Sequence, residues 1–151
     1  MNESNINALK QSYKRIVVPV DGSNLSVKAA KLGCLLAKIS NKKLIFIHVA
    51  ELPATALPHG DGTYVPEISQ SVKEHGKAIL NGIMNNCSDD TIDMETKLLE
   101  GIPHNQINSF TNKDDLVIMG SKGHSAVERV LIGSVSENVL HHSDASVMII
   151  R

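Results

Sequence analysis

Apolar runs of strand length alternate with longer segments of helical period from one end of the chain to the other. This alternation limits the fold more than any other feature of the sequence, because it is typical of parallel β-α-β units. Strands joined by right-handed crossovers predict an open, doubly wound, five-stranded α/β sheet of Rossmann-like form, with helices on both faces. The expected strands are, in chain order, 15–20, 43–49, 92–99, 116–119 and 146–150.

Helices are expected between these strands. The first has an apolar face, because Leu25, Ala29 and Leu32 recur at spacings of four and three residues. A second helix is expected over about 67–86, a short third one begins at Pro103, which suits a first helical position, and a last one covers 134–142. The segment 52–66 contains three prolines and two glycines, which predicts a loop.

Composition and charge narrow the class of partner. The 151 residues include 15 basic and 16 acidic side chains, for a net charge of −1, and 3% are aromatic. A nucleic-acid partner is not expected, because its phosphate backbone needs a basic surface and its bases need aromatic rings for stacking. No apolar run approaches the roughly 18 residues of a membrane span, and the amino-terminal segment lacks a signal-peptide stretch. We therefore expect a one-domain cytoplasmic protein with no membrane partner.

Several common sites are not indicated. Cys34 and Cys87 lack CxxC spacing, which favours reduced thiols that serve as packing residues. The seven histidines show no HExxH or comparable spacing, which argues against a structural metal site. A G-x4-G-K-[ST] motif is absent and no G-x-G-x-x-G follows the first strand, so neither a P-loop NTPase nor a dinucleotide dehydrogenase is indicated.

The most informative stretch links the fourth strand to the last helix. Gly120, Gly123 and Gly133 bracket it, and glycines permit a close approach of the backbone. The amino end of the helix offers backbone N–H groups to an anion such as phosphate, at Gly133, Ser134, Val135 and Ser136. In an alternative interpretation, the first two glycines only turn the chain, and Ser134 forms a capping box with Glu137. The spacing leaves both interpretations open.

The pattern Gly120-x2-Gly123-x9-Gly133-Ser134 resembles the ATP-binding signature of the universal stress protein family. The resemblance also covers Pro19-Val20-Asp21, His48-Val49, Val117-Ile118-Met119 and the closing strand, so it spans residues 14–151 as one nucleotide-binding domain and leaves 1–13 as an amino-terminal extension. It implies the strand order 3-2-1-4-5, with a nucleotide beyond the carboxyl ends of the first and fourth strands. This crevice is the topological switch point, where such sheets bind ligands.

The resemblance also implies roles for individual residues. Asp21 and the backbone of Val49 contact adenine and ribose, while Pro19, Val20 and Met119 shape the base pocket. The phosphates are surrounded by Gly120, Gly123, Gly133, Ser134, Val135 and Ser136. Apart from the resemblance, the position of His124 directly after Gly123 would let its N–H face the phosphates, or His124 is only a loop residue. Electrostatics supports this orientation, because a carboxylate repels phosphate but accepts hydrogen bonds from ribose hydroxyls or an adenine amino group. Alternatively, Asp21 only caps the first helix.

The expected function is that of an ATP-binding regulatory protein. Sequence does not choose between ATP, ADP and AMP, nor does it name the regulatory protein partner. Mg²⁺ is expected with the nucleotide, with Ser134 or Ser136 as hydroxyl ligands. Two alternatives remain: a slow ATPase or autophosphorylating enzyme on the same fold, and a nucleotide-free interaction module. The sequence shows no Ser/His/Asp or Cys/His set and no G-x-S-x-G elbow for catalysis.

The last strand predicts a homodimer, because the resemblance places it at the edge of the sheet. It carries an apolar run with no proline or inward charge to protect it from pairing with another chain. The interface residues are Ser146, Val147, Met148, Ile149 and Ile150. The alternative is that a helix or the amino-terminal residues 1–13 cover this edge within a monomer.

Overall fold

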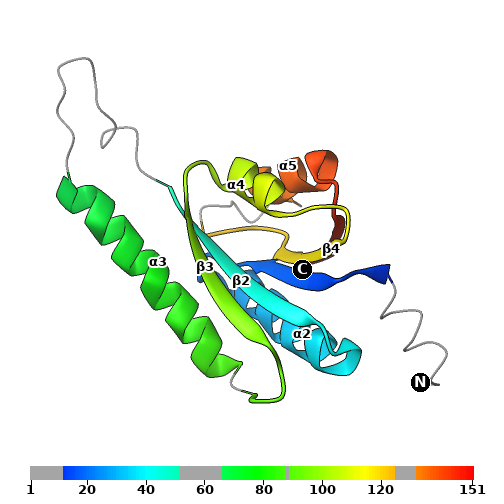
Figure 1. The fold of residues 1–151 in the computed structure, drawn as a ribbon. Coiled ribbons are helices and arrows are strands. Elements are labelled where there is room, and N and C mark those ends of the chain that lie inside the picture. The colour runs from blue at the N-terminus through cyan, green and yellow to red at the C-terminus, as the bar shows by residue number, and fades with distance from the viewer. Residues whose placement is uncertain (1–11, 52–65, 88, 125–131) are drawn as a thin grey trace.

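The computed structural model describes residues 12–51, 66–87, 89–124 and 132–151 and confirms the open α/β fold (Figure 1). A five-stranded parallel sheet has the order β3-β2-β1-β4-β5, as the resemblance implied. The strands are β1 (Arg15–Pro19), β2 (Lys43–Ala50), β3 (Met94–Glu100), β4 (Asp115–Gly120) and β5 (Ser146–Ile150). The helices are α2 (Asn24–Ser40), α3 (Pro66–Asn86), α4 (Pro103–Phe110) and α5 (Ser134–His142).

The core has two halves, because alternate side chains of each strand point to opposite faces of the sheet. Helices α2 and α3 cover one face, where Ile16, Val18 and Phe46 are fully buried. Helices α4 and α5 cover the other face, where Val17 and Ile45 are buried. Figure 1 shows the two helix pairs on opposite sides of the twisted sheet. This arrangement accounts for the continuous apolar runs of the central strands, which are covered on both faces.

The element bounds follow the predictions with small differences. The last helix and the last strand have the predicted bounds. β4 begins earlier than predicted because Asp115 belongs to it, and the buried Asp115 carboxylate pairs with Arg15, whose Nε lies 2.6 Å from Oδ1. The predicted loop 52–66 lies outside the described residues except for Pro66, which begins α3. No helix in the described ranges is long and apolar enough to cross a membrane.

The sheet opens between β1 and β4. Their pairing stops at Val17 opposite Val117, although both strands continue. Main-chain groups of successive residues face alternate neighbours, and the Val20 N–H donates to the Ile47 carbonyl of β2 at 2.8 Å, so position 19 faces β4. Pro19 has no N–H to donate there. The proline therefore ends the ladder where the strand order reverses.

A disulfide joins Cys34 of α2 to Cys87, the residue that follows α3, across 53 positions of the chain. The Cα atoms of the pair are 6.4 Å apart, which lies in the usual range for disulfides. The expectation that both cysteines are reduced packing residues was therefore wrong. The pairing depends on α2 and α3 lying against the same face of the sheet. The spacing of two isolated cysteines along the chain does not predict this packing.

Candidate functional site

A cavity of about 530 Å³ opens at the carboxyl ends of β1, β2 and β4. It takes in the seam that Pro19 leaves between β1 and β4. All the site residues expected from the sequence line it: Pro19, Val20, Asp21, Val49, Met119, Gly120, Gly123, His124, Gly133, Ser134, Val135 and Ser136. The sequence analysis left out the remaining lining residues, which are Ser26, Ile47, His48, Glu51, Pro103, Ile107 and Lys122.

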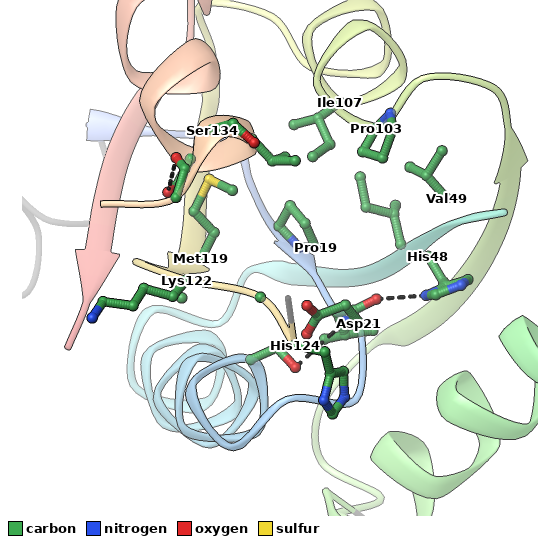
Figure 2. A pocket seen from close by; sticks show the side chains of 18 of the residues that line it. Pro19, Asp21, His48, Val49, Pro103, Ile107, Met119, Lys122, His124 and Ser134 are labelled. Carbon is green, nitrogen blue, oxygen red and sulfur yellow. Dashed lines mark hydrogen bonds between the residues drawn. The ribbon is translucent and has the colours of Figure 1, made fainter. Parts of the chain in front are cut away.

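One end of the cavity is apolar. Pro103 and Ile107 of α4 face Val49 of β2 there, and Pro19 and Met119 form its floor (Figure 2). Ile107 is buried, because α4 packs on the same sheet face as α5. The sequence predicted a helix at Pro103 but did not connect it with the site, because a crossover of about fifty residues separates it from β2. This end offers a slot for a flat, weakly polar group such as a base.

Asp21 stands below this slot, in the turn between β1 and α2. Gly22 adopts a φ of +84°, which only glycine reaches without strain, and Ser23 caps α2 by accepting from the Ser26 N–H at 3.2 Å. The interpretation of Asp21 as the helix cap was therefore wrong. The Asp21 Oδ1 atom instead accepts from the Ser23 N–H at 2.9 Å.

The Asp21 carboxylate is held in its charged form. Its half-burial alone would raise its pKa, but hydrogen bonds from Ser23 and Ser26, together with the nearby His124, hold the pKa of this carboxyl below its usual value. Figure 2 shows the His124 ring beside Asp21, away from the amino end of α5. The charged carboxylate is an acceptor for hydroxyl or amino groups and repels an anion.

His48 supports the wall of the cavity from the side of α3. Its Nδ1 atom donates to the Val20 carbonyl at 2.7 Å, since a carbonyl oxygen only accepts. Gly76 of α3 packs directly on the ring, where an added Cβ would lie 2.6 Å from His48 Cδ2. The position of the backbone next to Asp21 thus depends on α3 as well as on the sheet.

The other end of the cavity is the amino end of α5. Glu137 donates the first intrahelical hydrogen bond to the Gly133 carbonyl, at 2.9 Å. The N–H groups of Ser134, Val135 and Ser136 precede that bond and have no partner within the helix. Gly133 is the N-cap and no side chain caps the helix, so the capping-box interpretation with Ser134 was wrong. These N–H groups and the helix dipole suit an anion.

Two polar groups at the start of α5 already make hydrogen bonds within the protein. The Gly133 N–H donates to the Ser121 carbonyl at 2.6 Å, so it is not among the donors that face the cavity. The buried Ser136 hydroxyl lies 2.8 Å from the Ser121 carbonyl and 2.9 Å from the Gly133 carbonyl. Both bonds hold the start of α5 against the end of β4. Of the two serines expected to bind a metal ion, only Ser134 is exposed.

The spacing of the three glycines has a steric reason at each position. A Cβ at Gly120 would lie 2.9 Å from the Leu25 Cβ, so this glycine lets β4 end against α2. A Cβ at Gly123 would lie 2.5 Å from Asp21 Oδ2, and one at Gly133 would lie 3.3 Å from the Ser121 carbonyl oxygen. Gly123 thus keeps the space above the carboxylate open. The side chain of Lys122, between these glycines, extends away from Asp21 and His124 in Figure 2.

Comparison with known proteins identifies the family. A model of the universal stress protein family matches residues 12–151. The chain belongs to the universal stress protein family. Among its curated relatives in the family is universal stress protein MJ0531 of Methanocaldococcus jannaschii, which is 34% identical over 142 residues that make up 92% of this chain and 82% of the relative.

Solved structures of universal stress proteins share the fold. UspA from Lactobacillus plantarum is 25% identical, with a TM-score of 0.79 over 92% of this chain and 98% of that one. A universal stress protein solved in complex with cAMP is also 25% identical, with a TM-score of 0.61 over 93% of this chain and 98% of that one. At least one structural relative therefore binds an adenine nucleotide.

Proposed function

We propose that this protein binds ATP in the cavity between β1 and β4 and acts as a nucleotide-responsive regulatory homodimer. The observation that carries the proposal is the division of the cavity into an apolar slot, a charged carboxylate and a helix amino end. A nucleotide has the same three parts in the same order: a flat base, a ribose with hydroxyl donors, and an anionic chain. The cAMP bound to a relative also combines an adenine base, a ribose and an anionic phosphate, although its phosphate closes a ring on the ribose.

The base and ribose are assigned to the end near Asp21. Adenine enters the slot between Val49, Pro103 and Ile107, and the backbone of Val49 is the group that reads its edge. The Asp21 carboxylate accepts hydrogen bonds from the ribose hydroxyls. The opposite orientation would place phosphates beside this carboxylate, where the two negative charges repel each other.

The phosphates are assigned to the amino end of α5. The N–H groups of Ser134, Val135 and Ser136 donate to phosphate oxygens, and the open space at Gly123 lets the chain pass over Asp21. Mg²⁺ fits here as a companion of the nucleotide, where it neutralises phosphate charge. The exposed Ser134 hydroxyl is the protein ligand we assign to it, since that of Ser136 is engaged with two carbonyls.

The homodimer is assigned to β5, the edge strand of the sheet. Ile150 accepts from the Ser121 N–H at 2.8 Å, so Met148 and Ile150 direct their main-chain groups towards β4. Val147 and Ile149 therefore direct their N–H and C=O groups outward. An antiparallel copy of β5 would satisfy these groups and cover Met148, whose side chain is 37% exposed.

Calorimetry with the full chain tests the nucleotide assignment. We expect Mg-ATP to bind at least tenfold more tightly than Mg-GTP, because the backbone of Val49 is placed to read the edge of adenine. The Asp21→Asn variant should weaken ATP binding, since an amide offers the ribose one acceptor where the carboxylate offers two. Equal affinity for ATP and GTP in the unmodified chain, or no binding of either, would contradict the assignment.

A further inference from the structure

The disulfide lies beside a second cavity, on the other side of the sheet from α4 and α5. This groove of about 270 Å³ is separate from the nucleotide cavity and contains both cysteines. Cys34 is half-buried, whereas Cys87 is 8% exposed, so Cys34 is the more accessible of the two. The groove is lined by Lys31, Cys34, Leu35, Lys38, Asn86, Cys87, Asp89 and Ile92.

The chemistry of the groove suits an incoming thiolate. Lys31 and Lys38 contribute two positive charges and Asp89 one negative charge, which leaves a net positive charge next to the disulfide. The Lys38 Nζ atom lies 2.7 Å from Asp89 Oδ2, and this ion pair holds the Lys38 side chain at the rim of the groove. Leu35 is 54% exposed and gives the same rim an apolar contact surface. Thiol–disulfide exchange proceeds by thiolate attack on an accessible sulfur, and a positive surrounding favours the thiolate.

Helix α3 connects the groove with the nucleotide cavity. Cys87 follows its carboxyl end, and Leu80 and Ile83 anchor it in the core. Nearer its amino end, Gly76 packs on His48, which holds the Val20 carbonyl at 2.7 Å. An added Cβ at Gly22 would also contact the Ile79 side chain, at 3.5 Å. The disulfide thus links α3 to α2, and α3 is the helix that packs on both sides of the Asp21 turn.

We propose that the Cys34–Cys87 disulfide is a redox switch on the nucleotide cavity, opened by a dithiol reductant that attacks Cys34 from the groove. The inference rests on the proposed function, because nucleotide binding is what the switch regulates. With the disulfide closed, α3 is fixed against His48 and the Asp21 turn is held in place. With it open, the carboxyl end of α3 is free of α2, the support of His48 loosens and nucleotide affinity falls.

The exchange balances as two substitutions at sulfur. A thiolate of the dithiol attacks the Cys34 sulfur, the bond between Cys34 and Cys87 breaks, and the Cys87 thiolate takes up a proton. The second thiolate of the reductant then attacks the reductant sulfur that is bonded to Cys34 in the mixed disulfide. The Cys34 thiolate is released and also takes up a proton. The protein gains two thiols and the reductant becomes a disulfide.

Two measurements on the full chain test the switch. The chain is treated with diamide, which oxidises paired thiols to a disulfide, or with reduced dithiothreitol. Its thiols are counted by alkylation and mass spectrometry, and the dissociation constant for Mg-ATP is measured in each state. We expect no alkylated cysteine in the oxidised chain, two in the reduced chain, and an increase in the dissociation constant of about tenfold on reduction. The Cys34→Ser and Cys87→Ser variants should bind ATP with the reduced affinity under both conditions.

A trapping experiment tests which sulfur is attacked. In the Cys87→Ser variant only the thiol of Cys34 remains, and in Cys34→Ser only that of Cys87. We expect glutathione disulfide to form a mixed disulfide at least ten times faster with the first variant. Equal rates would overturn the assignment of Cys34 as the point of attack.

The outcomes separate this inference from the function on which it rests. If oxidised and reduced chains bind ATP equally, the switch is overturned and the nucleotide site stands. If neither state binds ATP, the proposed function fails and the switch fails with it. If two alkylated cysteines remain after treatment with diamide, the disulfide does not form in solution and the switch is overturned whatever the affinity.

Discussion

The two faces of the sheet are built differently. The face of α2 and α3 carries helices of 17 and 21 residues, the disulfide and, among the described residues, a cluster of fourteen buried hydrophobic side chains. The face of α4 and α5 carries helices of 8 and 9 residues over a cluster of eight. Both short helices begin at the cavity: α4 contributes Pro103 and Ile107 to its apolar end, and α5 contributes Ser134, Val135 and Ser136 to the other end. We therefore expect the first face to provide most of the stability and the second to provide most of the contacts with a bound nucleotide.

The chain's two phenylalanines, one on each face, give the strongest contrast. Phe46 is fully buried on the α2–α3 face, so Phe46→Ala should reduce the free energy of unfolding by about 3–5 kcal/mol. Phe110 is half-buried on the α4–α5 face, below the Arg15 guanidinium, and Phe110→Ala should reduce it by about 1 kcal/mol. Urea unfolding measures both values. A larger loss for Phe110→Ala would contradict the division between the faces.

Substitution at the start of α5 should affect binding more than stability. A valine at position 133 would crowd the Ser121 carbonyl and the first N–H groups of α5, so Gly133→Val should weaken ATP binding at least 100-fold, which is about 2.7 kcal/mol. The matched control is Gly82→Val in α3, where an added Cβ meets nothing within 4 Å. Calorimetry should show unchanged affinity for the control. Wild-type affinity in Gly133→Val would contradict the assignment of α5 to the nucleotide site.

The edge strand β5 belongs to both faces of the sheet, and substitutions in it test the proposed dimer interface. Val147→Pro removes an outward N–H and should shift the protein from dimer to monomer with little change in thermal stability. Met148→Pro removes an N–H that faces β4 and should instead lower the melting temperature by several degrees, about 2–4 °C for each kcal/mol lost. Light scattering and thermal unfolding distinguish the two variants. A wild-type chain that is monomeric at micromolar concentrations would refute the interface.

The smallest expected effect is that of Asp21 on acid stability. Because the folded pKa of Asp21 lies below its ordinary value of 3.8, its charged form stabilises the fold above that pH, and this contribution is lost as the pH falls through the lower, folded pKa. The Asp21→Asn variant should therefore lose less stability than the wild type between about pH 4 and pH 2. Urea unfolding at a series of pH values measures it, and identical acid limbs for the two proteins would exclude the contribution.

Local sequence patterns predicted the elements well, and they failed where distant segments meet. The bounds of α5 and β5 were predicted because each has a clear period and a clear start. Asp115 was taken as a polar residue before a strand, yet it is 1% exposed inside β4, because Arg15 from a neighbouring strand neutralises it. The Cys34–Cys87 pair failed for the same reason, since only the packing of two helices brings the sulfur atoms together.

The site shows the same division between motif and packing. The glycine spacing and Asp21 were predicted to lie together, and the described residues place them around one cavity. Pro103 and Ile107 were not assigned to it, because no local motif marks them, and His48 was given no role although the resemblance covers it. Their place follows from the crossover that lays α4 over β2 and from the helix α3 that packs on His48. Prediction of such residues requires the packing of the helices on the sheet, which the spacing of residues along the chain does not give.

Pro19 has a consequence for the kinetics of binding. A hydrogen-bonded ladder between β1 and β4 would have to break before a ligand entered, and that step would limit the rate of association. The missing N–H of Pro19 prevents this ladder from extending past Val17, so β1 and β4 do not pair along the crevice. We therefore expect the observed rate of nucleotide association to rise in proportion to nucleotide concentration without reaching a plateau.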